Sequence, residues 1–95
     1  MIKHVQVKIT GKVQGIGFRW CSYEKFVELG LVGKAENVRD GSVEIDVTGE
    51  EMALEQFIEW ARKGPEGARV ENVETSEVSE LPAVEPVKND KNEQN

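Results

Sequence analysis

The chain has 95 residues, of which 38% are hydrophobic, and its formal net charge is −6. That length is typical of one domain with one core, and the acidic balance argues against the broad basic surface with which proteins bind nucleic acid. The single cysteine, Cys21, excludes an internal disulfide, and Met1 to Lys8 carry no long apolar run, so we expect a cytoplasmic protein without a signal peptide or membrane span.

The first third of the chain predicts a strand, a glycine-rich loop and a helix. Apolar and polar residues alternate from Val5 to Thr10, which is the period of a strand with one buried face. Three glycines between Gly11 and Gly17 interrupt this alternation. From Phe18 the apolar residues follow helical spacing instead, and Gly30 is a typical helix terminator. The strand therefore leads through the loop directly into the helix.

The middle of the chain predicts a pair of antiparallel strands. Leu31 to Val38 lead into an extended segment, and Asp40-Gly41 precedes the alternating residues Ser42 to Val47. An Asp-Gly pair before such alternation is a strong hairpin signal.

A second helix and a last strand follow. Thr48 to Glu51 have the spacing of a helix capping box, and the apolar stripe after them ends at Gly64-Pro65. Alternation resumes weakly between Val70 and Val78, as in a strand exposed on one face.

The order of these elements predicts the fold class. A β-α-β-β-α-β order with two helices on one face of an antiparallel sheet is the ferredoxin-like α+β sandwich. We expect this domain to span residues 1–84. Residues 85–95 are rich in Lys, Asn, Asp, Glu and Gln and are expected to form a flexible polar tail, although Leu81 to Val84 offer a short edge strand.

The loop between the first strand and the first helix is the candidate functional site. A helix N-terminus has unpaired N–H groups and the positive end of the helix dipole, and both favour an anion. Gly15 and Gly17 let an anion approach the main chain. The Arg19 guanidinium offers bidentate hydrogen bonds to two phosphate oxygens. On spacing alone, the alternative that the glycines only make a tight turn and Arg19 is a surface charge stays open.

The same residues resemble a known family. Gly11 to Arg19 is similar to the phosphate-binding loop of acylphosphatases. The resemblance extends over Val5 to Val78, and that family's fold is also the ferredoxin-like sandwich. Its further motifs, in the family's order and spacing, are Gly33-x-x-x-Asn37, Asp40-Gly41-Ser42-Val43, Phe57-x-x-Trp60, Gly64-Pro65 and Ala68-x-Val70.

The resemblance implies an enzyme that hydrolyses the carboxyl-phosphate anhydride of acyl phosphates to a carboxylate and inorganic phosphate. It assigns phosphoryl binding to Arg19 and positioning of the attacking water to Asn37. Ser22 stands where the family usually has threonine; its hydroxyl either supports the loop or the asparagine, or Ser22 is simply a small buried residue. The residues expected to bind phosphate are Val13, Gln14, Gly15, Ile16, Gly17, Phe18 and Arg19.

This chemistry is consistent with what the sequence lacks. The leaving carboxylate has a conjugate acid with a pKa of about 4 and needs no general acid. We expect His4, the only histidine, at the surface or a strand end, and Cys21 half-buried in the helix rather than acting as a nucleophile. No cluster of side chains has metal-ligand spacing, so the sequence predicts no metal and no cofactor.

Other residues near the motifs are less informative. Trp20 and Trp60 are interpreted as packing residues. Lys34-Ala35-Glu36 departs from the bulkier Gly-Trp-Val common at this place in the family, and we expect it to add a charge pair beside the site. The expected partners are a small acyl phosphate of undetermined identity and phosphate or sulfate as a product-like ligand, with no nucleic acid or membrane partner. A monomer is the expected state.

Two other functions stay open. In the first, the chain is a non-catalytic binding module whose loop binds a phosphorylated ligand without hydrolysing it. The chain also resembles the first domain of a larger carbamoyl-transferring maturation protein, but its short length and polar end favour a separate enzyme.

Overall fold

The computed structural model describes residues 1–78, and the elements within them follow the predicted order. The elements are β1 (Ile2–Lys12), α1 (Phe18–Leu29), β2 (Val32–Asn37), β3 (Val43–Glu50), α2 (Glu51–Lys63) and β4 (Arg69–Val78). The expected edge strand at 81–84 and the tail at 85–95 lie outside the described residues.

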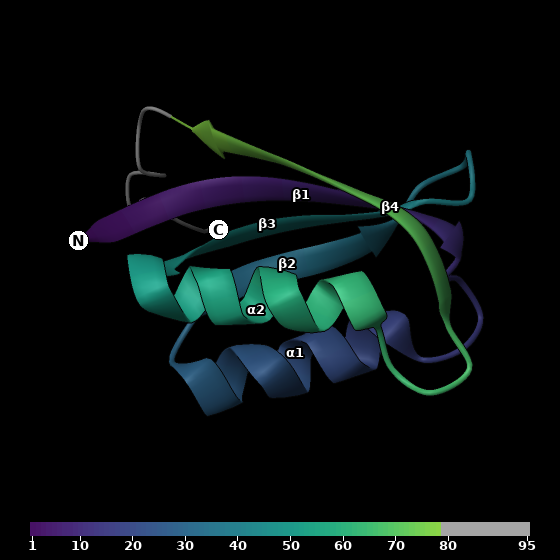
Figure 1. The fold of residues 1–95 in the computed structure, drawn as a ribbon, viewed down its shortest axis with the longest axis horizontal. Coiled ribbons are helices and arrows are strands. Elements are labelled where there is room, and N and C mark those ends of the chain that lie inside the picture. The colour runs from purple at the N-terminus through teal and green to yellow at the C-terminus, as the bar shows by residue number, and fades with distance from the viewer. Residues whose placement is uncertain (79–95) are drawn as a thin grey trace, which may run out of the picture.

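The strands form one antiparallel sheet in the order β2-β3-β1-β4. Both helices cover the same face of this sheet, and within residues 1–78 its other face carries no helix (Figure 1). This arrangement confirms the predicted ferredoxin-like fold. No helix within residues 1–78 is long and apolar enough to cross a membrane.

The core fills the space between the sheet and the helices. Alternation in β1 and β3 turns every second side chain toward the helices, where burying apolar surface is worth about 25 cal/mol per Å². The rings of Phe26 and Phe57, with centroids 5.1 Å apart, join the two helices. The buried core residues of β1 and β3 are Val5, Val7, Ile9, Val43, Ile45 and Val47.

The last strand contains an irregularity that explains its weak pattern. Thr10 pairs with Asn72 but Gly11 pairs with Val70, so one residue of β4 is left over. Such a bulge changes the alternation, and Val70 and Val73 both pack against the core. A Cβ on Gly11 would lie 2.2 Å from the Arg69 carbonyl oxygen, so glycine is required there.

The predicted capping box at the start of α2 is wrong. Thr48 lies within β3, which stays paired with β1 as far as Glu50. Glu50 is the N-cap residue and makes no side-chain capping hydrogen bond. The Glu51 N–H instead donates to the Met1 carbonyl oxygen at 3.1 Å. Strand pairing therefore takes the place of a capping side chain.

Candidate active site

The loop between β1 and α1 has the backbone that its glycines predict. Gly15 and Gly17 have φ angles of 78° and 82°, in the left-handed region that disfavours residues with a Cβ. Gly17 is the N-cap of α1, makes no side-chain capping bond, and has no acidic residue after it in the first helical turn. The positive end of the helix dipole is therefore not offset by a nearby carboxylate on this turn.

The loop, the first turn of α1 and the end of β2 surround one hollow of about 210 Å³. Arg19 comes from α1, and Asn37 is the last residue of β2. The structure thus brings together the two residues that the sequence separates by 18 positions. The lining residues are Val13, Gly15, Gly17, Phe18, Arg19, Trp20 and Asn37.

Two of the predicted phosphate-binding residues direct their side chains elsewhere. Ile16 packs against the hydrophobic core. The side-chain amide of Gln14 donates to the carbonyl oxygens of Val38 at 2.7 Å and Ser42 at 2.9 Å. Gln14 therefore ties the loop to the turn that follows Asn37.

That turn is itself held by an ionised carboxylate. Asp40 accepts hydrogen bonds from the Ser42 hydroxyl at 2.6 Å and the Ser42 N–H at 2.9 Å, and Lys8 approaches it at 3.2 Å. The hydrogen bonds from Ser42, followed by the one from Lys8, lower the pKa of Asp40 to about 2. The carbonyl oxygens that hold Gln14 thus lie on a turn that the Asp40 carboxylate stabilises.

Ser22 lies in α1, one turn after Phe18, which lines the hollow. It is fully buried, and its hydroxyl donates to the Phe18 carbonyl oxygen at 2.8 Å. Phe18 is the first residue of α1, and its ring packs edge-on against Trp60 with centroids 5.5 Å apart. The hydroxyl bond of Ser22 is therefore made within the first turn of α1 and not to Asn37.

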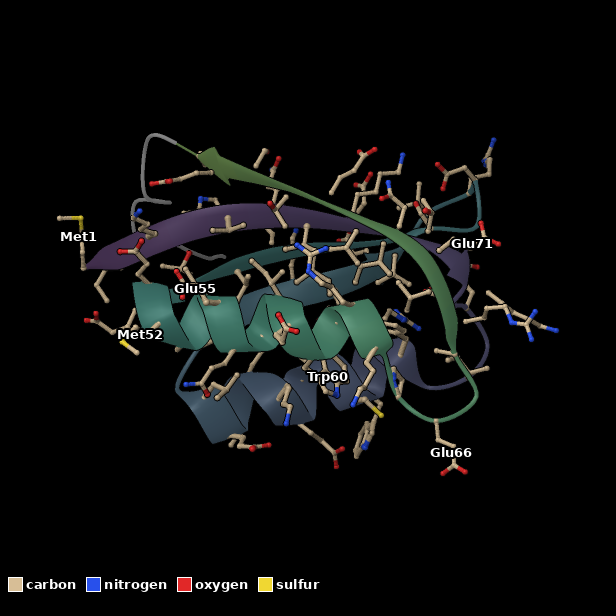
Figure 2. The ribbon with its side chains drawn as sticks, in the orientation of Figure 1. Met1, Met52, Glu55, Trp60, Glu66 and Glu71 are labelled. Atoms are coloured by element: carbon tan, nitrogen blue, oxygen red, sulfur yellow. The ribbon has the colours of Figure 1, made fainter. Side chains whose placement is uncertain are left out.

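The two tryptophans have different environments. Trp60 packs as predicted, on the side of α2 turned toward α1 (Figure 2). The interpretation of Trp20 as a packing residue is wrong, because its side chain is 71% exposed and lines the hollow beside Arg19. Trp20 lies off the helical stripe formed by Ser22 and Phe26, and this spacing could have identified it as an exposed residue.

His4 lies two residues from the start of β1, near the expected strand end, but it is not a surface residue. It is buried in β1, on the sheet face without helices, where it pairs in register with Thr48 and Val78 from the two flanking strands. Its Nε2 contacts the Asp46 carboxylate. Cys21 is half-buried and free, as predicted. Within residues 1–78, no group of three or more His, Cys, Asp or Glu side chains is arranged to hold a metal ion.

The charge pair at Lys34 and Glu36 does not lie beside the candidate site as expected. The two side chains face each other at 3.5 Å and line a separate hollow of about 480 Å³ on the sheet face without helices. Strand alternation is the reason, since it turns Lys34 and Glu36 away from the helices and Ala35 toward them.

The fold and the loop define a small α+β domain with an open helix N-terminus beside an arginine and an asparagine. A sequence model of the family described as Acylphosphatase matches residues 5–86. The chain is 46% identical over 72 residues to an acylphosphatase of Caldanaerobacter subterraneus subsp. tengcongensis, an alignment that covers 76% of this chain and 80% of that one.

Solved structures give the same result. The crystal structure of acylphosphatase from Bacillus subtilis superposes with a TM-score of 0.82 at 31% identity and covers 87% of this chain and 91% of that one. Full-length HypF, in a phosphate- and nucleotide-bound form, matches with a TM-score of 0.78 at 28% identity over 99% of this chain but 12% of its own. The chain therefore belongs to the acylphosphatase family, whose function is the hydrolysis of acyl phosphates.

Proposed function

We propose that the hollow between the loop and Asn37 is where this chain hydrolyses acyl phosphates. The N–H groups of the loop and the guanidinium of Arg19 bind the phosphoryl oxygens, and the side-chain amide of Asn37 orients the attacking water. The observation that carries the proposal is that Gly15, Gly17, Arg19 and Asn37 line one hollow at a helix N-terminus.

The reaction demands little acid–base chemistry from the protein. Water forms a new oxygen–phosphorus bond while the bond between phosphorus and the carboxylate oxygen breaks. The carboxylate leaves without a proton, since the pKa of its conjugate acid is about 4, and a phosphoryl oxygen takes the proton of the water. What remains is in-line placement of the water and stabilisation of the phosphoryl oxygens, which Asn37, Arg19 and the loop amides supply.

Several further properties belong to the same proposal. Phosphate or sulfate is the expected product-like ligand because the loop contacts only the phosphoryl end of the substrate. We further propose that the enzyme is monomeric, acts in the cytoplasm, and needs neither metal nor cofactor. The single cysteine supports the location, and the lability of the anhydride supports the metal independence.

Hydrolysis of benzoyl phosphate in buffer with EDTA tests the proposal. The unmodified chain should turn over well above the buffer blank. Arg19→Ala should weaken phosphate binding and turnover together, by a factor on the order of tenfold or more, because it removes a charge-assisted hydrogen bond worth about 1.5–3 kcal/mol. Asn37→Ala should mainly lower kcat.

Two outcomes would contradict the proposal. Phosphate binding without turnover would identify a non-catalytic binding module instead. Loss of phosphate affinity with intact kcat in Asn37→Ala would contradict the role of Asn37. Lys63→Ala serves as a control, since it removes a positive charge from the exposed end of α2 rather than from the hollow.

A further inference from the structure

A tyrosine on α1 makes a hydrogen bond to the main chain of β2. The Ala35 N–H donates to the Tyr23 hydroxyl at 3.0 Å, and that hydroxyl faces the Ala35 carbonyl oxygen at 3.5 Å. The Tyr23 ring packs edge-on against Phe26, with centroids 5.4 Å apart. Among the strands of residues 1–78, β2 lies at an edge of the sheet, and Tyr23 contacts main-chain groups on the side of β2 away from β3.

The contact lies directly beside the candidate active site. Tyr23 follows Arg19 by four residues, which is about 6 Å along a helix, and Ala35 precedes Asn37 by two residues, which is about 6.7 Å along a strand. The short connection after α1 makes β2 run back along the helix (Figure 1). The hydrogen bond from Ala35 to Tyr23 therefore lies about one helical turn from Arg19 and two strand residues from Asn37, and these two residues line the same hollow.

Few side chains of β2 itself pack against α1. Ala35 is the one buried residue of β2, and its side chain is a single methyl group. Among the side-chain hydrogen bonds and ion pairs described for residues 1–78, Tyr23 supplies the ones that join α1 to β2. In the same range, the Asn37 side chain has no hydrogen-bond partner of its own, so the strand sets its position.

We propose that Tyr23 is a positioning residue that sets where the Asn37 amide lies opposite Arg19. The inference rests on the proposed function of Asn37 in orienting water. β3 pairs with one edge of β2 as far as Asn37, so removing the hydroxyl loosens β2 on its α1 side, and the Asn37 side chain shifts relative to Arg19. Arg19 stays in place because it belongs to the first turn of α1.

Tyr23→Phe removes the hydroxyl and keeps the ring on Phe26. We expect kcat for benzoyl phosphate to fall about 3- to 30-fold, within the hundredfold that a displacement near 1 Å can cost. The inhibition constant of inorganic phosphate should change less than about twofold, since phosphate is held by the loop and Arg19. Val27→Ala, one turn further along α1 and 82% exposed in the parent chain, should leave both quantities unchanged.

A double-variant cycle separates positioning from a general loss of structure. If Tyr23 acts through Asn37, then Tyr23→Phe should lower kcat little or not at all in an Asn37→Ala background. An equal fall in both backgrounds, or an unchanged kcat in Tyr23→Phe alone, would overturn the inference. Thermal unfolding of each variant ensures that the assay temperature lies well below its Tm.

A second readout does not depend on turnover. In a titration with inorganic phosphate followed by NMR, the side-chain amide signals of Asn37 should shift in the parent chain and shift much less in Tyr23→Phe, at similar phosphate affinity. An equal shift in both proteins would overturn the inference even if no hydrolysis is observed. Absence of hydrolysis with the expected difference in shift would contradict the proposed function alone.

Discussion

Gly17 and Gly30 lie at opposite ends of α1 and offer a matched pair of substitutions. Both have a left-handed backbone, with φ angles of 82° and 72°. A Cβ built on either one would meet no atom within 4 Å. Replacing either glycine by alanine therefore introduces backbone strain without a steric clash, and only Gly17 lines the hollow.

The expected effect on stability is the same for both variants. A left-handed backbone costs a residue with a Cβ about 1–2 kcal/mol, and the reduced freedom of the unfolded chain returns about 0.4–1 kcal/mol. Each variant should therefore lose up to about 1.5 kcal/mol of unfolding free energy, and each 1 kcal/mol lost lowers Tm by about 4–8 °C in a domain of this size.

The effect on the site should differ. Gly17→Ala can relax by turning the loop away from its left-handed conformation, which moves N–H groups off the anion. If about 1 kcal/mol of strain is relieved in this way, the dissociation constant of inorganic phosphate rises about fivefold, since 1.4 kcal/mol corresponds to a factor of ten. Gly30→Ala should leave that constant unchanged.

Urea unfolding and phosphate titration by calorimetry measure the two quantities separately. Unchanged phosphate affinity in Gly17→Ala, despite the loss of stability, would refute the argument that the loop amides bind the anion. An equal loss of affinity in Gly30→Ala would show that the effect comes from general destabilisation.

Two further predictions concern the surroundings of the hollow. The pKa of Asp40 lies at about 2, below its ordinary value of 3.8, so its contribution to stability is present above pH 4 and is lost as the pH falls from about 4 to 2. Urea unfolding across this range should show a shallower fall for Asp40→Asn, and identical slopes would contradict the role of the carboxylate. Trp20 is 71% exposed and lines the hollow, so Trp20→Ala should raise KM for benzoyl phosphate more than for acetyl phosphate. Steady-state kinetics with both substrates test this, and equal changes would show that the indole does not contact the acyl group.

Much of the fold was predictable because the signals are local. Alternation marks β1 and β3, and the left-handed glycines Gly17 and Gly30 mark both ends of α1. The start of α2 was not predictable, because whether Thr48 caps a helix or continues a strand depends on its pairing with β1. The weak pattern of β4 likewise results from a bulge opposite Gly11, which only the register reveals.

The candidate site divides in the same way. The sequence by itself indicated the glycine-rich loop as the candidate site, because glycines and an arginine at the start of a helix favour anion binding. The family resemblance added Asn37. Only the tertiary structure decided that Asn37 lines the same hollow as Arg19. It also decided that Lys34 and Glu36 lie on the opposite face of the sheet and that Trp20 is exposed. It also decided the bond between Tyr23 and Ala35. The reason is that a loop conformation depends on neighbours in the chain, whereas these contacts depend on how a helix and an edge strand lie against each other.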